Sequence, residues 1–186
     1  ELEMSIDRLQ STTSNVYRAL STPMIKSPSD VNVNAVGLFN STINTGSGDD
    51  VININSLATN EHISFGILNP GDANVASYGA YGSSINTGSG DDSINIDASS
   101  VSLRRDLWGW ESREIGLGQS EAVGLEKSTI NTGSGDDKVA ISAYSFGTIT
   151  NSWAIRDSSI DTGIGNDTVT LNASDLAVSM GQAIEP

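Results

Sequence analysis

STINTGSGDDVININS, residues 41–56, is the stretch that decides the fold, because three further tracts of the chain repeat it. The other copies read SSINTGSGDDSINIDAS at 83–99, STINTGSGDDKVAISA at 128–143 and SSIDTGIGNDTVTLNA at 158–173. The first turn glycines are Gly46, Gly88, Gly133 and Gly163, so the spacings are 42, 45 and 30 residues. Self-similarity at such periods is typical of repeat architectures.

Each tract predicts a short strand, a glycine turn and a second strand. In the second strand Ile52 and Ile54 alternate with Asn53 and Asn55, which indicates one buried face. The equivalent apolar residues are Ile94 and Ile96, Val139 and Ile141, and Val169 and Leu171, and before the turns Ile43, Ile85, Ile130 and Ile160. A third element precedes each tract, at residues 35–40, 76–82, 122–127 and 152–157, so one unit holds about three strands.

These units predict an all-β protein, a right-handed parallel β-helix (solenoid) of about five coils. A single unit cannot bury its apolar edge alone, whereas stacked coils form a continuous Ile/Val column and pair every strand. Identical turns at the same point of each unit favour stacking. A series of antiparallel hairpins in a sandwich is the competing interpretation.

The ends and insertions complete the expected domain plan. Ile6, Leu9, Val16 and Leu20 lie near one helical face, so a helix in 1–20 could cap the stack, although a frayed terminus is the alternative. We expect residues 1–30 to form this cap and a connector, and 31–186 to form the repeat domain. Residues 176–186, LAVSMGQAIEP, resemble the opening of another unit, so we expect the protein to continue or to have lost a further coil. The longer units carry insertions near 57–74 and 100–120, which we expect to be loops on one face.

Composition excludes several classes of function. Lys and Arg number 9 against 23 Asp and Glu, a net charge of −14, so neither nucleic acid nor an anionic membrane is an expected partner. The chain has no cysteine, which excludes disulfides, thiolate zinc sites and thiol catalysis. It has one histidine, His62. No apolar run approaches the roughly 20 residues of a membrane span. Cations or basic partners are the natural counterparts of this chain.

The glycine turn carries the chemistry that best matches this charge. Gly46 and Gly48 permit the positive φ of a sharp turn, and Asp49 and Asp50 then place carboxylates beside backbone carbonyls. Ca²⁺ takes about six to eight oxygen ligands of this kind. The other turns carry the equivalent carboxylates, among them Asp91, Asp92, Asp136 and Asp137.

Residues 45–53, TGSGDDVIN, resemble the nonapeptide G-G-x-G-x-D-x-U-x of RTX (hemolysin-type) calcium-binding repeats. Residues 87–95, 132–140 and 162–170 match equally well. The resemblance implies a parallel roll around Ca²⁺ and secretion by bacteria. By resemblance, the ligand aspartates are Asp50, Asp92, Asp137 and Asp167, and carbonyls would come from Gly46, Gly48, Gly88, Gly90, Gly133, Gly135, Gly163 and Gly165. Threonine replaces the first glycine in all four copies and there is one nonapeptide per unit, which favours a single column of sites on one edge.

A metal-free ladder is the alternative for the same residues. Asn44, Asn86, Asn131 and Asp161, like the threonines before the glycines, could hydrogen-bond between coils. Coils about 4.8 Å apart would place like charges so close that each repulsion is on the order of 3 kcal/mol at an effective dielectric of ~20. A bound cation, raised pKa values of the aspartates or outward rotation of their side chains would each remove this cost.

The insertions carry the remaining candidates. Glu61, His62 and Asp72 lie in the first insertion, and Arg104, Arg105 and Asp106 in the second, without a recognisable catalytic spacing, so we expect no enzyme activity. In the second insertion, Trp108 and Trp110 could form a platform for sugars or a protein, or close a small satellite core. Arg104 and Arg105 could grip a carboxylated glycan or merely neutralise the acidic edge.

The sequence therefore predicts a secreted or surface-exposed bacterial module, bound to Ca²⁺, with a structural or adhesive role. Its expected partners are calcium ions, extracellular or cell-surface polysaccharide, or further β-helix repeats. A lyase-like, epimerase-like or accessory β-helix that processes or binds polysaccharide is the alternative. A fibre segment that acts as a rigid spacer is the third interpretation.

Overall fold

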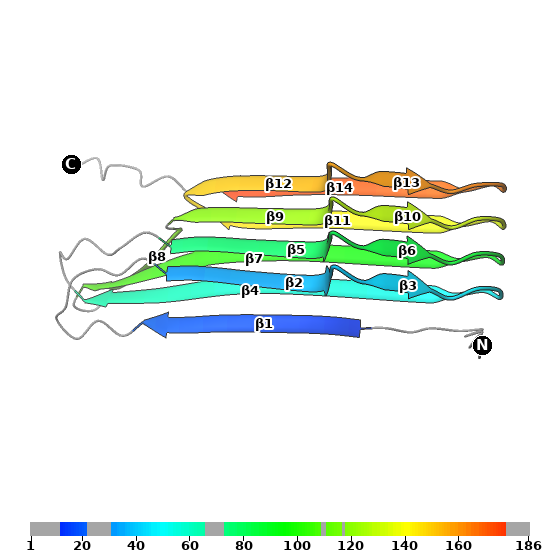
Figure 1. Ribbon diagram of the computed structural model, residues 1–186. Helices are drawn as coiled ribbons and strands as arrows, with labels where there is room; N and C mark the ends of the chain where they lie inside the picture. Colours follow the sequence, from blue (N-terminus) through cyan, green and yellow to red (C-terminus); the bar gives the residue numbers. More distant parts are fainter. Residues whose placement is uncertain (1–11, 22–30, 66–72, 109–110, 117, 178–186) are drawn as a thin grey trace.

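The computed structural model describes residues 12–21, 31–65, 73–108, 111–116 and 118–177, and this part of the chain is all-β (Figure 1). Its strands run side by side in three stacked parallel sheets. None of the described residues belongs to a helix that could cross a membrane.

Each sheet collects one element from every unit. The long sheet contains β1 (Thr12–Ser21), β4 (Val51–Phe65), β7 (Ser93–Trp108), β11 (Lys138–Gly147) and β14 (Thr168–Ala177), in that order. The medium sheet contains β2 (Val31–Phe39), β5 (Ala73–Tyr81), β9 (Gln119–Glu126) and β12 (Ile149–Arg156). The short sheet contains β3 (Thr42–Asn44), β6 (Ser84–Asn86), β10 (Thr129–Asn131) and β13 (Ser159–Asp161).

The register of these sheets confirms that like residues stack on like. Ile43 pairs with Ile85, which pairs with Ile130, which pairs with Ile160. The two strands that flank each glycine turn lie in different sheets, and both pair in parallel with their equivalents. The parallel β-helix is therefore confirmed and the antiparallel hairpin sandwich is wrong. We number the four coils 1 to 4 in chain order; β1 adds a fifth strand to the long sheet alone.

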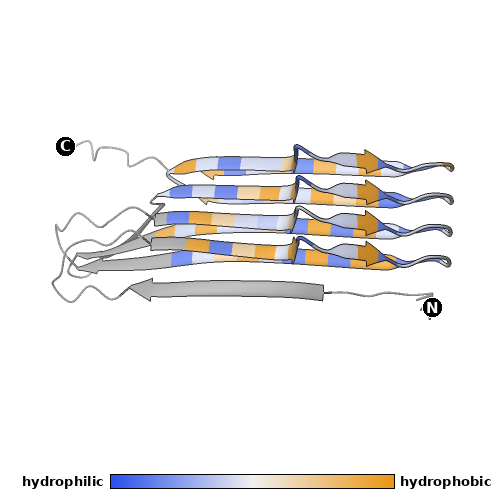
Figure 2. Ribbon diagram, viewed as in Figure 1, coloured by the Kyte–Doolittle hydropathy of each residue, from blue (hydrophilic) through white to orange (hydrophobic). Residues whose placement is uncertain are grey.

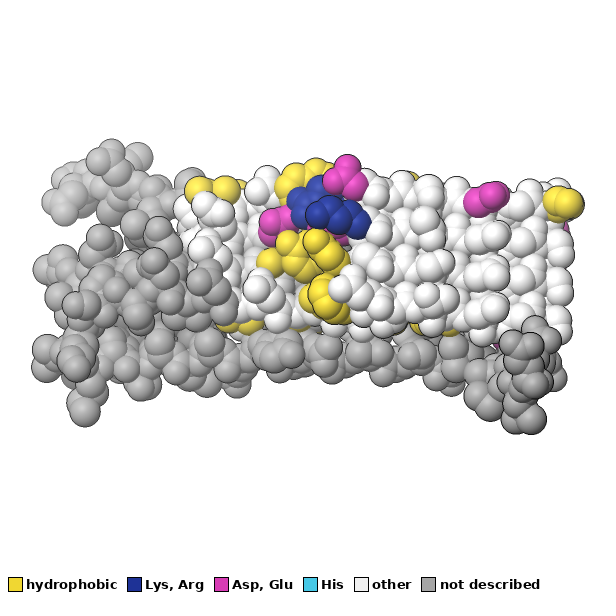
Figure 3. Space-filling view, viewed as in Figure 1, with side chains coloured by type: hydrophobic (Ala, Val, Ile, Leu, Met, Phe, Trp, Pro, Cys, Tyr) yellow, Lys and Arg dark blue, Asp and Glu magenta, His cyan; other side chains and the backbone are white. Residues whose placement is uncertain are grey.

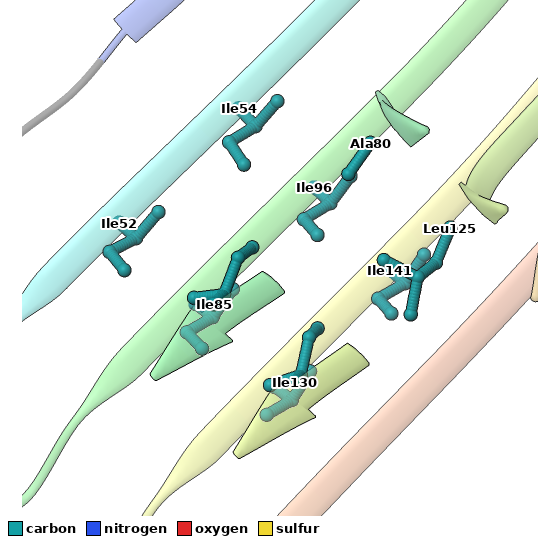
Figure 4. Packing of buried hydrophobic residues seen from close by; sticks show 10 residues of the cluster. Ile52, Ile54, Ala80, Ile85, Ile96, Leu125, Ile130 and Ile141 are labelled. Carbon is teal, nitrogen blue, oxygen red and sulfur yellow. The ribbon is translucent and has the colours of Figure 1, made fainter. Parts of the chain in front are cut away.

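The predicted apolar column forms the core. Ile52, Ile94 and Val139 are almost fully buried and are paired coil over coil. Ile54, Ile96 and Ile141 are buried to the same degree and stack on one another (Figure 4). The same alternation appears as hydrophobic and hydrophilic bands in every coil (Figure 2). Val169 and Leu171 continue the column in coil 4 but are 43% and 47% exposed, because no described strand pairs with the outer edge of β14.

The N-terminal segment differs from expectation. Residues Thr12–Ser21 form β1, which pairs in parallel with Asn53–His62 of β4. The predicted helix is therefore wrong from residue 12 to residue 20, and residues 1–11 lie outside the described part. The free edge of β4 offers ladder hydrogen bonds, which explains how this segment can be extended.

The insertions also differ from expectation, because they are largely strands rather than loops. β4 continues to Phe65 and β7 to Trp108, and the two pair along the whole extension. β8 (Glu111–Gly116) then folds back antiparallel on β7. Adjacent coils 1 and 2 carry insertions at the same point, so each insertion provides the other with a partner strand. Residues 66–72 and 109–110 lie outside the described part.

Candidate cation-binding corner

The four glycine turns form one corner of the solenoid, between the short and the long sheets. Single parallel bridges join Ser47 to Ser89, Ser89 to Ser134 and Ser134 to Ile164. The turns therefore lie directly above one another at one end of the molecule (Figure 1), as the sequence predicts.

Stacking alone requires the glycines of this corner. Gly88 and Gly90 have φ of 98° and 126°, values that side chains rarely allow. A Cβ atom on Gly88 would overlap the carbonyl oxygen of Gly46, and one on Gly90 would overlap that of Gly48. The same overlap recurs in the next two coils. The glycine pattern is thus explained without a metal.

Several glycine carbonyls already serve the stack. The carbonyl oxygens of Gly46, Gly88 and Gly133 accept hydrogen bonds of 2.9 to 3.0 Å from the next coil, donated by Ser89, Ser134 and Ile164. A carbonyl oxygen has two lone pairs, so one remains for any other partner. Their role as calcium ligands stays a prediction.

The aspartates at the end of each turn form a buried column, which we call the inner column: Asp50, Asp92, Asp137 and Asp167. The first three are at most 1% exposed, and Asp167 is partly buried. The backbone N–H of Asp50 donates to Oδ1 of Asp92 at 2.9 Å. The next two steps repeat this contact at 2.8 and 3.0 Å. The position that matches the repeat aspartate is therefore inside the corner and not on its surface.

The preceding residues form an exposed outer column: Asp49, Asp91, Asp136 and Asn166. Here the hydrogen bonds run in the opposite direction, from the N–H of Asp91 to Oδ1 of Asp49 at 2.9 Å. Asp136 and Asn166 continue the series at the same distance. Asn166 shows that this column accommodates a neutral side chain.

The inner column holds carboxylate oxygens without a partner. Oδ1 and Oδ2 of Asp50 and Oδ2 of Asp92 and Asp137 are buried and accept no hydrogen bond. Burial, together with the nearby charges of Asp137 and Asp50, raises the pKa of Asp92 above its ordinary value, although the hydrogen bond from the Asp50 backbone opposes the shift. An unpaired buried carboxylate is costly, so the inner column needs a proton or a cation.

Calcium suits part of this arrangement. Carboxylate oxygens are the ligands Ca²⁺ prefers, and the unpartnered oxygens of Asp50, Asp92 and Asp137 are available. Among the described residues, however, no three acidic or imidazole side chains converge closely enough to form a ready-made metal site. The residues therefore fit a cation shared between coils better than a complete cage within one coil.

Threonine and asparagine ladders accompany the aspartates. The buried hydroxyl of Thr45 donates to the carbonyl oxygen of Thr87 at 3.1 Å, and Thr87 and Thr132 repeat the contact. Nδ2 of Asn86 lies 3.5 Å from Oδ1 of Asn44. Of the ladder expected for a metal-free corner, the threonine series and one asparagine pair are thus present, and they leave the aspartate oxygens unpartnered.

The structure places the candidate glycan-binding residues far along the long sheet. Arg104 and Arg105 lie on β7, opposite His62 and Ile63 of β4. Trp108 is the last residue of β7, and Trp110 lies outside the described part. Both interpretations of the two tryptophans, a binding platform and a small satellite core, stay predictions.

An aromatic and basic patch on the medium sheet was not predicted (Figure 3). Tyr81 stacks on Phe39 of coil 1 with ring centroids 5.7 Å apart, and Lys127 of coil 3 lies 5.4 Å from its centroid. In coil 4 the guanidinium of Arg156 lies 4.7 Å from the ring of Trp153. The aromatic residues in the third element of coils 1, 2 and 4 were the available signal. Since Tyr81 contacts the coils on both sides, this patch links coils.

Comparison with protein-family models, with curated proteins and with solved structures gives no match for this chain, so its function is argued from the corner itself.

Proposed function

We propose that this chain is a structural solenoid module that takes up Ca²⁺ at its inner column. The observation that carries this proposal is the set of unpartnered oxygens on three aspartates that are at least 99% buried. A rigid stack of in-register coils suits a spacer or adhesive surface, and we assign it no catalytic role.

Electrostatics favours a cation over water at these oxygens. Uncompensated carboxylates in neighbouring coils repel one another by on the order of 3 kcal/mol at an effective dielectric of ~20, and water removes no charge. The coil spacing of about 4.8 Å is roughly twice a Ca–O distance. Consecutive carboxylates are therefore close enough to share an ion.

The residues that would hold the ion are Asp50, Asp92 and Asp137, with Asp167 as a more exposed member. Ca²⁺ bound there would supply positive charge and stabilise the folded stack by mass action. Millimolar calcium outside cells suits weak sites of this kind. Weak calcium sites and the RTX-like motif support our proposal that this is an extracellular or surface module of a bacterial protein.

Thermal unfolding tests the proposal with two adjacent substitutions of equal charge change. We expect Tm of the wild type to rise between EDTA and excess Ca²⁺. Asp137→Asn, in the inner column, should abolish most of this rise, whereas Asp136→Asn, in the outer column, should preserve it. Equal Tm in EDTA and Ca²⁺, or equal losses in the two variants, would refute calcium uptake at the inner column.

A further inference from the structure

The coil-4 end of the solenoid exposes the inside of the stack. No described strand pairs with the outer edges of β12, β13 and β14. Ile164 is 79% exposed, and Ile149 and Leu176 are about half exposed, as are the column residues Val169 and Leu171. This end, which we call the open end, therefore combines three free strand edges with an apolar surface.

The stack itself specifies what can cover the open end. In each existing interface, the glycine carbonyls of one coil lie where a Cβ atom of the next would be. A coil placed on Gly163 and Gly165 in the same way must carry glycine at both equivalent positions. The covering segment must also present Ile or Val over Ile160 and Val169 to continue the core. A coil of this repeat type meets these conditions.

The coil-1 end of a second copy provides such a coil. β2 and β3 end their sheets, so no described strand pairs with their outer edges. Coil 1 carries Gly46 and Gly48 in the corner and Ile43 and Ile52 in the core column. The long sheet is the exception at this end, because β1 occupies the edge of β4 from Asn53 to His62.

We propose that the open end of one copy binds the coil-1 end of a second copy, head to tail. β1 of the second copy then competes with β14 of the first copy for the edge of the second copy's β4. The new interface would repeat the coil–coil interfaces already present in the chain. Such a head-to-tail contact does not close on itself, so it generates linear assemblies. β1 then acts as a cap that limits growth, as terminal repeats do in solenoids.

Disulfide mapping tests the geometry, and the absence of cysteine in the chain makes it unambiguous. Thr42 and Ser159 are exposed and belong to one column through Ser84 and Thr129, so they would meet across the junction. A mixture of Thr42→Cys and Ser159→Cys chains should form mixed dimers on oxidation, while each variant alone should not. Dimers of Ser159→Cys alone, or none in the mixture, would overturn the head-to-tail arrangement.

Light scattering gives a second readout. The mass of the wild type should rise with concentration, Leu171→Arg at the open end should remain monomeric, and Tyr144→Arg on the outer face of β11 should behave as the wild type. Val16→Pro, which weakens the pairing of β1 with β4, should increase assembly. A monomeric wild type, or equal behaviour of Leu171→Arg and Tyr144→Arg, would contradict the proposal. The junction would also place Asp167 of one copy next to Asp50 of the other, in the manner of the existing inner-column contacts. Light scattering is therefore measured in both EDTA and Ca²⁺: assembly in EDTA supports the head-to-tail contact whatever the outcome for calcium uptake.

Discussion

The backbone N–H of Asp92 donates a hydrogen bond of 2.8 Å to Oδ1 of Asp137, one coil further along the stack. Its neighbour Asp91 donates in the opposite direction, to Oδ1 of Asp49. The two aspartates of one turn therefore belong to columns with different environments, one buried and one exposed. Their charges should have different consequences for stability.

The first prediction concerns pH. Because burial raises the pKa of Asp92 in the folded state, protonation favours folding. This contribution is fully present below the pKa of an unfolded aspartate, about 3.9, and is lost as pH rises through the folded value. In EDTA, Asp92→Asn should be more stable than the wild type at pH 7, and the difference should shrink as pH falls towards about 4. Urea unfolding across this range measures the difference.

The matched control for this prediction is Asp91→Asn in the outer column. Its difference from the wild type should change much less with pH, because the Asp91 carboxylate is exposed. If the difference in unfolding free energy between Asp92→Asn and the wild type did not change with pH, Asp92 would not be the group that titrates.

The second prediction compares two glycines with positive φ. Gly88 has φ 98° and lies against the carbonyl oxygen of Gly46, whereas Gly82 has φ 60°. Asn40 and Lys127, the equivalents of Gly82 in neighbouring coils, adopt nearly the same conformation. Gly88→Asn should therefore lower the free energy of unfolding by at least about 2 kcal/mol. Gly82→Asn should change it by less than about 0.5 kcal/mol, since only the mobile end of the Asn40 side chain must move.

Chemical denaturation of the two variants decides this comparison. Similar losses would mean that backbone conformation, and not the overlap with the carbonyl oxygen of the next coil, explains the need for glycine in the corner.

The stack could be predicted because every unit repeats the same alternation of apolar and polar residues and the same glycine turn. Ile52 and Ile54 alternate with polar residues in a pattern that fixes the buried face, and the turns fix the register. The same logic placed Asp50, Asp92 and Asp137 in one column. Whether that column is buried could not be read from the sequence, since aspartate is normally exposed.

Other parts of the interior could not be predicted, because polar residues in a strand usually face solvent. Ser77 of β5 instead donates to the Ser56 carbonyl across the interior, and Ser100 and Ser120 form a buried pair 2.7 Å apart. The pairing of the insertions was also missed, because it depends on two adjacent coils and neither strand extension shows a clear apolar alternation.

The third prediction compares two positions of one apolar column. Ile96 is fully buried between coils, whereas its counterpart Leu171 at the open end is 47% exposed. Ile96→Ala should cost about 2–5 kcal/mol of unfolding free energy, as buried truncations do. Leu171→Ala should cost about half as much or less, because less apolar area is lost. Unfolding at low protein concentration excludes any contribution from assembly. Equal losses of unfolding free energy in Ile96→Ala and Leu171→Ala would contradict the exposure of Leu171 at the open end.

The last prediction concerns the ion pairs of the medium sheet. Arg156 contacts Oε2 of Glu126 and Oε1 of Glu121, both at 2.5 Å, and the Glu126 side chain is only 7% exposed. Arg156→Gln leaves the Glu126 carboxylate buried without its cation, which should cost about 3–5 kcal/mol. Arg156→Gln combined with Glu126→Gln should recover much of that loss, because the buried charge of Glu126 is then gone and the Glu121 side chain, which also loses Arg156, is 31% exposed. A double-mutant cycle by urea unfolding measures the coupling, and strictly additive losses would show that the pair contributes nothing to the stability of the stack.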